Sequence, residues 1–183
     1  MLHELSLTCR SRLPTAPGPV PSGGPAIRRC DYTGSNINNF DWFKEHPDGN
    51  SDTFLPSSCA YELGGVIGAN ADGDGVSQYT DRTSTFSATI RPRVTGQHTF
   101  WVEADDGALL YLVYPNGGEW LVVDNGGAHA PQWRHGSVFL TSVYEYGLRV
   151  FWANGGQTGK LRIEFEDPIS GTKALESLTP ILV

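Results

Sequence analysis

Several features that would place a protein quickly are missing from this sequence of 183 residues. It has no run of about eighteen apolar residues, so no membrane-spanning helix is expected. Its first residues also lack the apolar centre of a signal peptide. Basic residues are few: 13 lysines and arginines stand against 20 aspartates and glutamates, and the formal net charge is −7. Because nucleic acids bind to clustered positive charge, we do not expect a nucleic-acid-binding protein.

Cysteine is also scarce, and no two cysteines have the CxxC spacing of a zinc knuckle. Cys30 and Cys59 fall in the part of the chain with the composition of a folded domain, whereas Cys9 lies outside it. Two alternatives remain open for Cys30 and Cys59. They form a disulfide, which would indicate an oxidising compartment, or they are free thiols. We favour the disulfide. The sequence has no Asn-x-Ser/Thr site, so glycosylation gives no indication of location.

Glycine and proline are abundant, with 22 and 12 residues, and this composition favours turns over long helices. Residues 11–25, SRLPTAPGPVPSGGP, have no periodicity, and we assign residues 1–25 to a flexible arm or linker. Short runs of β-branched and aromatic residues alternate with turn residues over 26–168, which we assign to one domain. Residues 169–183 form a tail, in which TPILV could add a last strand.

The clearest of these runs predict an all-β fold, an antiparallel β-sandwich or barrel, because they recur at short, regular spacing with turn residues between them. The predicted strands are 83–94, 98–104, 108–114, 119–124, 137–142, 145–153 and 159–167. TGQ (95–97) and PNGG (115–118) are predicted turns, and residues 34–75 predict long loops with short strands or one helical turn. In such folds, function is carried by the loops at the ends of the strands.

Two adjacent aspartates, Asp105 and Asp106, interrupt an otherwise apolar stretch, FWVEADDGALLYLV. Adjacent carboxylates repel each other and resist burial. One explanation is an ordinary turn, since Asp-Gly is common in hairpins. The other is a site for a hard cation such as calcium, which takes roughly six to eight oxygen ligands. Neighbouring side chains of a strand point to opposite faces, but two adjacent carboxylates can converge on one ion if their peptide bond is cis.

Three segments in order resemble the PA-fourteen domain: TGQHTFWVEADDGALLYLV, LVVDNGGAHAP and YGLRVFWANGGQTGKLRIEF. This module is named after a fragment of anthrax protective antigen, and it recurs in yeast flocculins and adhesins, bacterial glycosidases and other surface proteins. The resemblance covers about residues 86–167, extends more weakly back to Ala26, and leaves out residues 1–25. It implies a β-sandwich or barrel, in agreement with the strand pattern. The chain departs from the family at Gly126, where many members have Trp, and at Ala104, where Ser is frequent.

The resemblance also implies a calcium site. In the adhesin branch of the family, a cis Asp-Asp pair binds calcium, and an Asn on a second loop completes the site with main-chain carbonyls that follow it. The matching side chains here are Asp105, Asp106 and Asn154, and the matching carbonyls belong to Gly156 and Thr158. His129 falls in the family's second motif, where we expect it to make a structural hydrogen bond between loops.

Three side chains do not fill the coordination shell of calcium, so we predict that two adjacent hydroxyls of a glycan bind the ion held at Asp105, Asp106 and Asn154. Two tryptophans outside the clear strands, Trp42 and Trp133, are candidates for a platform under a sugar ring, and we assign Trp133 to a loop and to this site. Strand tryptophans such as Trp152 are expected in the core.

Other candidate metal-binding or catalytic motifs in the sequence are weaker. The acidic stretch NADGDGVSQYTD (70–81) has oxygen-bearing residues at EF-hand positions, but it ends in Asp and has no flanking helical pattern, so we favour a solvated loop. No Ser/His/Asp or Cys/His arrangement stands out. The abundance of acids leaves a paired-carboxylate glycosidase open as an alternative, but we do not expect an enzyme.

Together these interpretations predict a calcium-dependent carbohydrate-binding, lectin-like module of a secreted or cell-surface protein, with weakly bound glycans as partners. The alternative is a structural subunit of an extracellular assembly or filament, in which residues 1–25 contact neighbouring copies of the chain. A third possibility, an accessory domain of an enzyme or a small hydrolase, would be revealed by turnover of a glycan. The sequence does not indicate which sugar is bound, because specificity belongs to variable loops.

Overall fold

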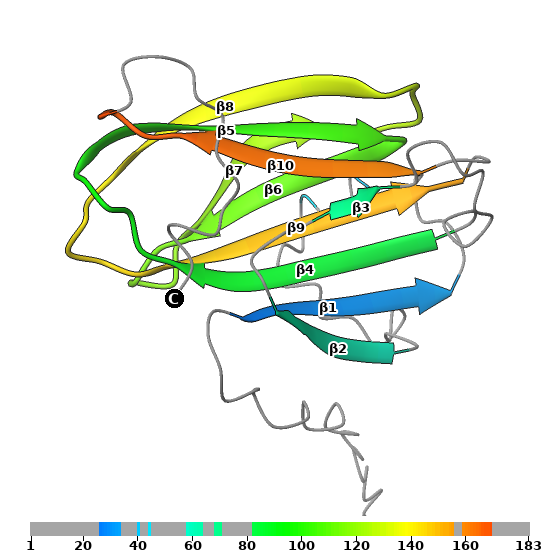
Figure 1. The fold of residues 1–183 in the computed structure, drawn as a ribbon, viewed down its shortest axis with the longest axis horizontal. Helices are drawn as coiled ribbons and strands as arrows, with labels where there is room; N and C mark the ends of the chain where they lie inside the picture. Colours follow the sequence, from blue (N-terminus) through cyan, green and yellow to red (C-terminus); the bar gives the residue numbers. More distant parts are fainter. Residues whose placement is uncertain are drawn as a thin grey trace, which may run out of the picture.

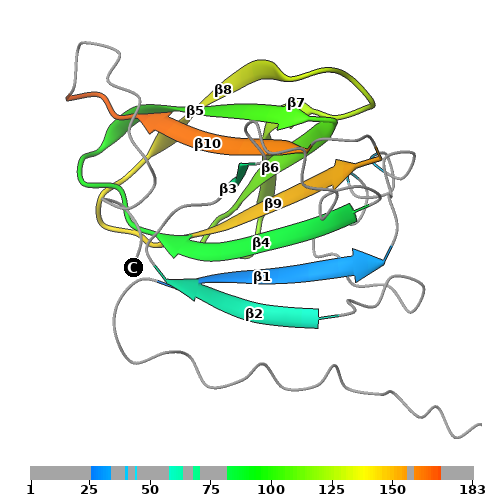
Figure 2. The ribbon, with the colours of Figure 1, turned by 45° about the vertical axis from the view of Figure 1, so that its right-hand side comes forward.

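A computed structural model describes residues 26–33, 40, 44, 58–63, 68–70, 82–155 and 159–169. These residues form two antiparallel sheets, which lie as two layers in Figures 1 and 2. One sheet has the order β2-β1-β4-β9-β6-β7 and the other β3-β10-β5-β8. The strands are β1 (Ala26–Thr33), β2 (Ser58–Leu63), β3 (Gly68–Asn70), β4 (Arg82–Ile90), β5 (Gly96–Asp105), β6 (Gly107–Val113), β7 (Glu119–Asn125), β8 (Gln132–Leu140), β9 (Tyr146–Asn154) and β10 (Lys160–Glu166).

The predicted β-sandwich is confirmed, and the seven predicted strands correspond to β4 to β10 with shifted ends. β4 ends at Ile90, earlier than predicted, because Pro92 has no N–H to offer a ladder. β5 already begins at Gly96, inside the predicted TGQ turn. β8 begins at Gln132 rather than at 137, since its first residues are polar and carry little strand signal. β1, β2 and β3 fall where no particular strand was predicted.

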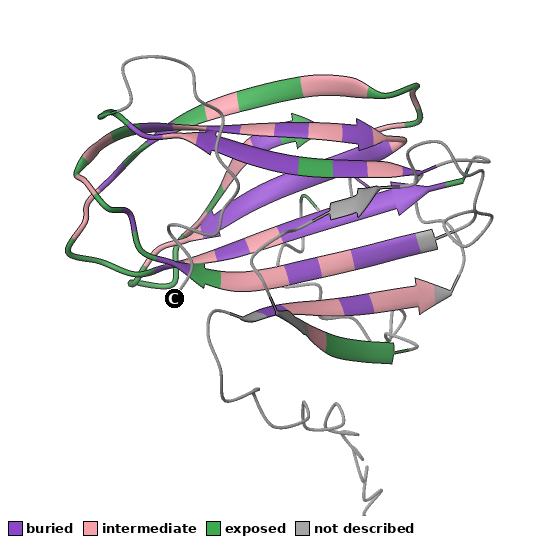
Figure 3. Cartoon of the chain, viewed as in Figure 1, coloured by how far each residue is buried: buried purple, intermediate pink, exposed green. Residues whose placement is uncertain are grey.

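β6 is buried on both faces, which explains why its sequence reads as a continuous apolar run. Leu110 and Leu112 belong to the main core between the sheets. Leu109 and Tyr111 point the other way, into a smaller cluster with Phe40 and others on the outer side of the six-stranded sheet. Figure 3 shows the contrast between the buried central strands and exposed β2 at the sheet edge. Each such leucine contributes about 1.5 to 3 kcal/mol by leaving water.

The two sheets also approach each other along one side of the sandwich. A Cβ built on Gly136 of β8 would lie 1.7 Å from the carbonyl oxygen of Val122 in β7. Only glycine allows the two strands to come this close. β7 is an edge strand of one sheet and β8 an edge strand of the other, so this contact partly closes the sandwich.

The predicted disulfide between Cys30 and Cys59 is confirmed. The two residues are direct partners in the β1–β2 ladder, with Cα atoms 4.1 Å apart, so the bridge joins neighbouring strands of one sheet. In the described part of the chain, no helix is long and apolar enough to cross a membrane. The arm assigned to 1–25 and the strand suggested at TPILV lie outside the described residues.

We predict that the disulfide contributes on the order of 3 to 4 kcal/mol, because it closes a loop with a sequence separation of 29 residues in the unfolded chain. Reduction with dithiothreitol should therefore lower the melting temperature by roughly 10 °C in a calorimetric scan. The double change Cys30→Ser plus Cys59→Ser is the control, and dithiothreitol should then have no further effect. An unchanged melting temperature after verified reduction would contradict the prediction.

A second prediction concerns His98, which is fully buried on β5. Its Nδ1 lies 3.0 Å from the carbonyl oxygen of Gly96, and its Nε2 has no partner. Since a carbonyl only accepts, Nδ1 carries the proton of the neutral ring. Burial lowers the pKa of His98, and the nearby Arg93 adds to this effect, while the Gly96 bond and Asp167 oppose it.

The unfolded chain then takes up a proton at higher pH than the folded one, so the fold loses stability as pH falls below about 6.5. His98→Asn keeps a donor towards Gly96 and removes the titration. Urea unfolding at a series of pH values from about 7 to about 5 should give a shallower loss of stability for this variant than for wild type. Parallel slopes, whatever the offset between them, would contradict this role of His98.

Candidate functional site

Each of the three segments that carry the resemblance contains a connection between the two sheets. The three connections lie at the same end of the sandwich. Asp106 links β5 of one sheet to β6 of the other, residues 126–131 link β7 to β8, and residues 155–159 link β9 to β10. The opposite end carries the β6–β7 turn and the β8–β9 connection. Figure 1 shows this arrangement. The fold thus gathers residues far apart in sequence at one end.

The acidic pair sits at the tightest of these connections. Asp105 is the last residue of β5, Asp106 lies between the strands, and Gly107 opens β6. The peptide bond between the two aspartates is cis, the geometry that the resemblance implied. Both aspartates are partly exposed, so their carboxylates can be reached from solvent.

The end of β9 holds this pair in place. The Trp152 Nε1–H donates to the carbonyl oxygen of Asp105 at 3.0 Å, and the Gly155 N–H donates to Oδ2 of Asp106 at 2.9 Å. Gly107 pairs with Ala153 in the β6–β9 ladder, which brings Asp106 level with Asn154. Asn154 is fully buried. The structure therefore places Asp105, Asp106 and Asn154, the three residues expected at the site, at neighbouring backbone positions at this end of the sandwich.

The charge of the pair is not balanced by the described part of the protein. Burial, and then the neighbouring charge of Asp106, raise the pKa of Asp105, while the coulombic effect of His129 lowers it. No described cationic side chain lies within ion-pair distance of either carboxylate. Lys160 is the cross-strand neighbour of Asp105, but its Nζ lies 3.3 Å from Oε2 of Glu103. The fold thus disfavours the ionised form of Asp105, and a bound cation would relieve this cost.

Two glycines leave the space in which the site is built. A Cβ on Gly107 would lie 2.6 Å from the carbonyl oxygen of Gly127, in the β7–β8 connection. A Cβ on Gly159 would lie 2.6 Å from Nδ2 of Asn154 and 2.6 Å from a ring carbon of Trp152. Because any other residue would push these groups apart, Gly107 and Gly159 are structural parts of the site that sequence reasoning did not single out.

His129 does not make the bond between loops that was expected. Its Nε2 lies 3.2 Å from the carbonyl oxygen of Asn125 and its Nδ1 2.9 Å from that of Ala130, so both contacts stay within the β7–β8 connection. The link between strands is made by Asn125, whose buried Nδ2 donates to the carbonyls of Val102 in β5 and Gln132 in β8. The Asn of the Asp-Asn motif is thus the joining residue.

Trp133 lies in β8 and not in a loop, which corrects the sequence interpretation. It pairs with Glu103 in the β5–β8 ladder, and the guanidinium of Arg162 lies 5.8 Å from the centre of its ring. Most residues of β8 before Val138 are polar, so the sequence pattern did not predict this part of the strand. Gly156, Thr158, Trp42 and most of the acidic stretch 70–81 lie outside the described residues.

The donors at this end suit a hard cation. Two carboxylates and one amide oxygen are the oxygen ligands that calcium prefers. Zinc and copper favour nitrogen and sulfur ligands. Within the described ranges, no three His, Cys, Asp or Glu side chains gather closely enough to hold a metal. A cation here would thus depend on the amide of Asn154 and on backbone oxygens in addition to the aspartates.

Comparisons with known proteins agree with this geometry. The family model of the PA14 domain matches residues 38–175. The chain is similar to the A domain of epithelial adhesin 9 from Candida glabrata, solved in complex with Galb1-3GlcNAc, with a TM-score of 0.65 and 14% identity over 87% of this chain and 88% of that chain. It is also similar to a PA14 sugar-binding domain from an RTX adhesin, with a TM-score of 0.60 and 16% identity over 87% and 98% of the two chains.

A third similar structure is a β-glucosidase from Kluyveromyces marxianus, with a TM-score of 0.53 and 15% identity. The match covers 77% of this chain and only 16% of the glucosidase. No curated protein matches the chain. At these identities the solved structures show a shared fold.

The two close approaches generate a prediction. Gly107→Ala and Gly159→Ala should each cost about 1 to 3 kcal/mol of unfolding free energy, because the added methyl group meets backbone or ring atoms that cannot move freely. Urea denaturation measures this cost. Gly118→Ala is the matched control, since the atom nearest to its Cβ belongs to the exposed side chain of Asn116. Equal stabilities of all three variants would show that the end of the sandwich tolerates more volume than its geometry implies.

Proposed function

Since the chain belongs to the PA14 domain family, we propose that it is a calcium-dependent carbohydrate-binding, lectin-like module of a secreted or cell-surface protein. The observation that carries the proposal is the position of the Asp105–Asp106 pair. Both carboxylates are solvent-accessible, level with the buried amide of Asn154, and without a described cationic partner.

Asp105, Asp106 and Asn154 would hold the calcium ion, with backbone carbonyls of the β9–β10 connection, including those of Gly156 and Thr158, as further ligands. When bound, calcium offers coordination positions that two neighbouring sugar hydroxyls can fill. The protein's own part is to keep the two carboxylates side by side, through Trp152 and the Gly155 N–H, and to leave them open to solvent.

We infer that Trp133 contacts a sugar bound at this end. It lies on the same face of the β5–β8 ladder as Asp105, because its partner Glu103 is two residues before Asp105 in β5. Diagonal neighbours of this kind are typically about 7 to 8 Å apart. The Arg162 guanidinium over its ring orients the tryptophan and adds a hydrogen-bond donor at the rim.

Two further features support the proposal. The solved structures similar to this chain include adhesin domains described as sugar-binding or solved with bound glycans, whereas the glucosidase match covers a small part of that enzyme. A binding module is therefore favoured over an enzyme. The Cys30–Cys59 disulfide suits an oxidising, extracellular setting.

The test is the double change Asp105→Asn plus Asp106→Asn. Wild type should bind calcium in isothermal titration calorimetry, and calcium at about 100 times its Kd should raise the melting temperature by roughly 5 to 10 °C. The double variant should lose both responses and the calcium-dependent retention on a panel of immobilised neutral glycans, because the carboxylates supply the charge that holds the ion.

Glu145→Gln is the matched control, since Glu145 is an exposed acid at the opposite end of the sandwich and should leave calcium binding intact. In the presence of a chelator, Asp105→Asn should raise the melting temperature, because burial and Asp106 disfavour the ionised carboxylate. Calcium binding without any glycan response would leave a structural ion, and no calcium binding at all would refute the proposal.

A further inference from the structure

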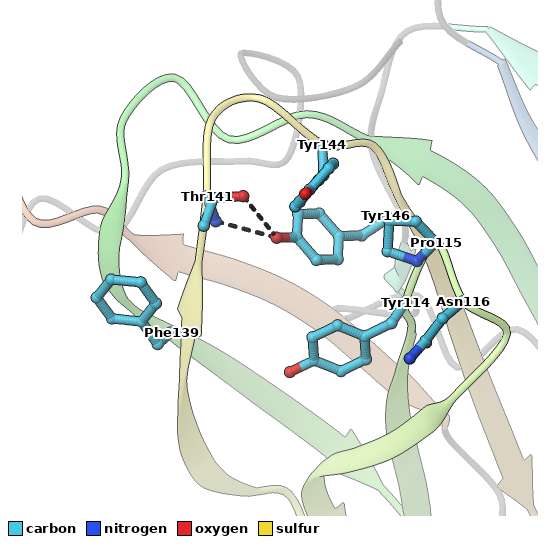
Figure 4. Close-up of a pocket in the computed structure, with 7 residues that line it drawn as sticks. All are labelled: Tyr114, Pro115, Asn116, Phe139, Thr141, Tyr144 and Tyr146. Carbon is cyan, nitrogen blue, oxygen red and sulfur yellow. Dashed lines mark hydrogen bonds between the residues drawn. The ribbon is translucent and has the colours of Figure 1, made fainter.

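A concave surface lies at the end of the sandwich opposite the acidic pair. It is a pocket of about 570 Å³ between the β6–β7 turn and the β8–β9 connection (Figure 4). Four aromatic rings line it, those of Tyr114, Phe139, Tyr144 and Tyr146. Asp106 precedes β6 and Tyr114 follows it, so seven residues of strand, roughly 23 Å, separate the two places.

Part of the pocket wall is rigid. The hydroxyl of Tyr146 lies 3.0 Å from the backbone nitrogen of Thr141 and 3.2 Å from its Oγ1. The ring of Tyr114 packs edge-on against Tyr146, with centroids 5.6 Å apart and an interplanar angle of 82°. Side chains fixed in this way lose little conformational entropy when a ligand binds.

The other part of the wall is open. Phe139 is 60% exposed and Tyr144 is 53% exposed, so both offer ring surface to solvent. Exposed apolar surface gathered beside a concavity is a feature of ligand-binding grooves. The opening is therefore the part of the pocket that a ligand would cover.

Polar groups in the pocket are few and uncharged. The Oδ1 of Asn116 accepts a hydrogen bond from the Gly118 N–H, which fixes the amide and leaves its NH₂ group for a ligand. The hydroxyl of Tyr114 has no hydrogen-bond partner among the described residues, and burial raises its pKa, so it is a neutral donor and acceptor. None of the described residues that line the pocket is charged.

We propose that this pocket is a second, metal-independent carbohydrate site that takes one neutral pyranose unit. A pyranose has an apolar face of C–H groups, which packs on the exposed aromatic rings, and equatorial hydroxyls, which suit the Asn116 amide and the Tyr114 hydroxyl. An acidic sugar is disfavoured, because none of the described lining residues carries a positive charge and the chain has a formal net charge of −7. The proposal does not rest on the calcium site.

The test uses the full chain in excess EDTA, so that any calcium-dependent binding is silent. Four probes are titrated by NMR, each to about 50 mM, the range needed for millimolar affinities: the methyl pyranosides of glucose, galactose and mannose, and N-acetylglucosamine. We expect at least one to bind with millimolar Kd. The double change Phe139→Ser plus Tyr144→Ser should weaken it by about tenfold, and Tyr114→Phe by a smaller factor.

Val143→Ser is the matched control, because Val143 is 77% exposed beside the pocket and does not line it. It should leave the affinity unchanged. All three serine substitutions replace exposed side chains, and the melting temperature checks that the variants are folded.

Two results would overturn the second site: none of the four sugars binds in EDTA, or binding survives the double change. Binding of an apolar probe such as anilinonaphthalene sulfonate with no sugar binding would also overturn it. Each outcome is separate from the calcium proposal, which fails only if the calcium-dependent signal is absent.

Discussion

The end of the sandwich that carries the acidic pair depends on one close approach of two backbones. Gly107, directly after the acidic pair, lies against Gly127 in the β7–β8 connection, at a distance that leaves no room for a Cβ atom. This contact lets the chain cross from one sheet to the other through the single residue Asp106. Asn125 then joins β5 to β8 through its buried amide. Without the close approach, the β5–β6 and β7–β8 connections could not be so short. The two aspartates would then not lie next to the end of β9.

This arrangement separates stability from function. The core between the sheets is apolar and fully buried, and it does not need the acidic pair. The pair adds repulsion that the described part of the fold does not neutralise. Local costs of this kind are found in natural proteins at functional sites, and the proposed cation would offset the one at this pair. The raised pKa of Asp105 and the buried Asn154 beside it are consistent with this division.

The sequence predicted most where one physical signal dominated. Alternating residues in β5 and the apolar run of β6 mark strands because the burial of their side chains is strongly periodic or complete. The proximity of the acidic pair to Asn154 could be expected because a rare motif carries these residues, whereas their role as ligands stays a prediction. Trp133 was misplaced because the start of β8 is polar, and only its pairing with β5 makes it a strand. The sequence did not predict the role of Gly159 or the aromatic pocket at the opposite end of the sandwich, because both depend on contacts between residues distant in sequence.

β6 has a further consequence for how the two ends of the sandwich relate. It is covered on both faces and hydrogen-bonded to β7 on one side and β9 on the other. Amides in such a strand exchange with solvent only when the whole domain opens, so β6 is among the most rigid parts of the chain. Since β6 runs directly from the acidic pair to the β6–β7 turn, it holds these two ends of the sandwich at a fixed separation.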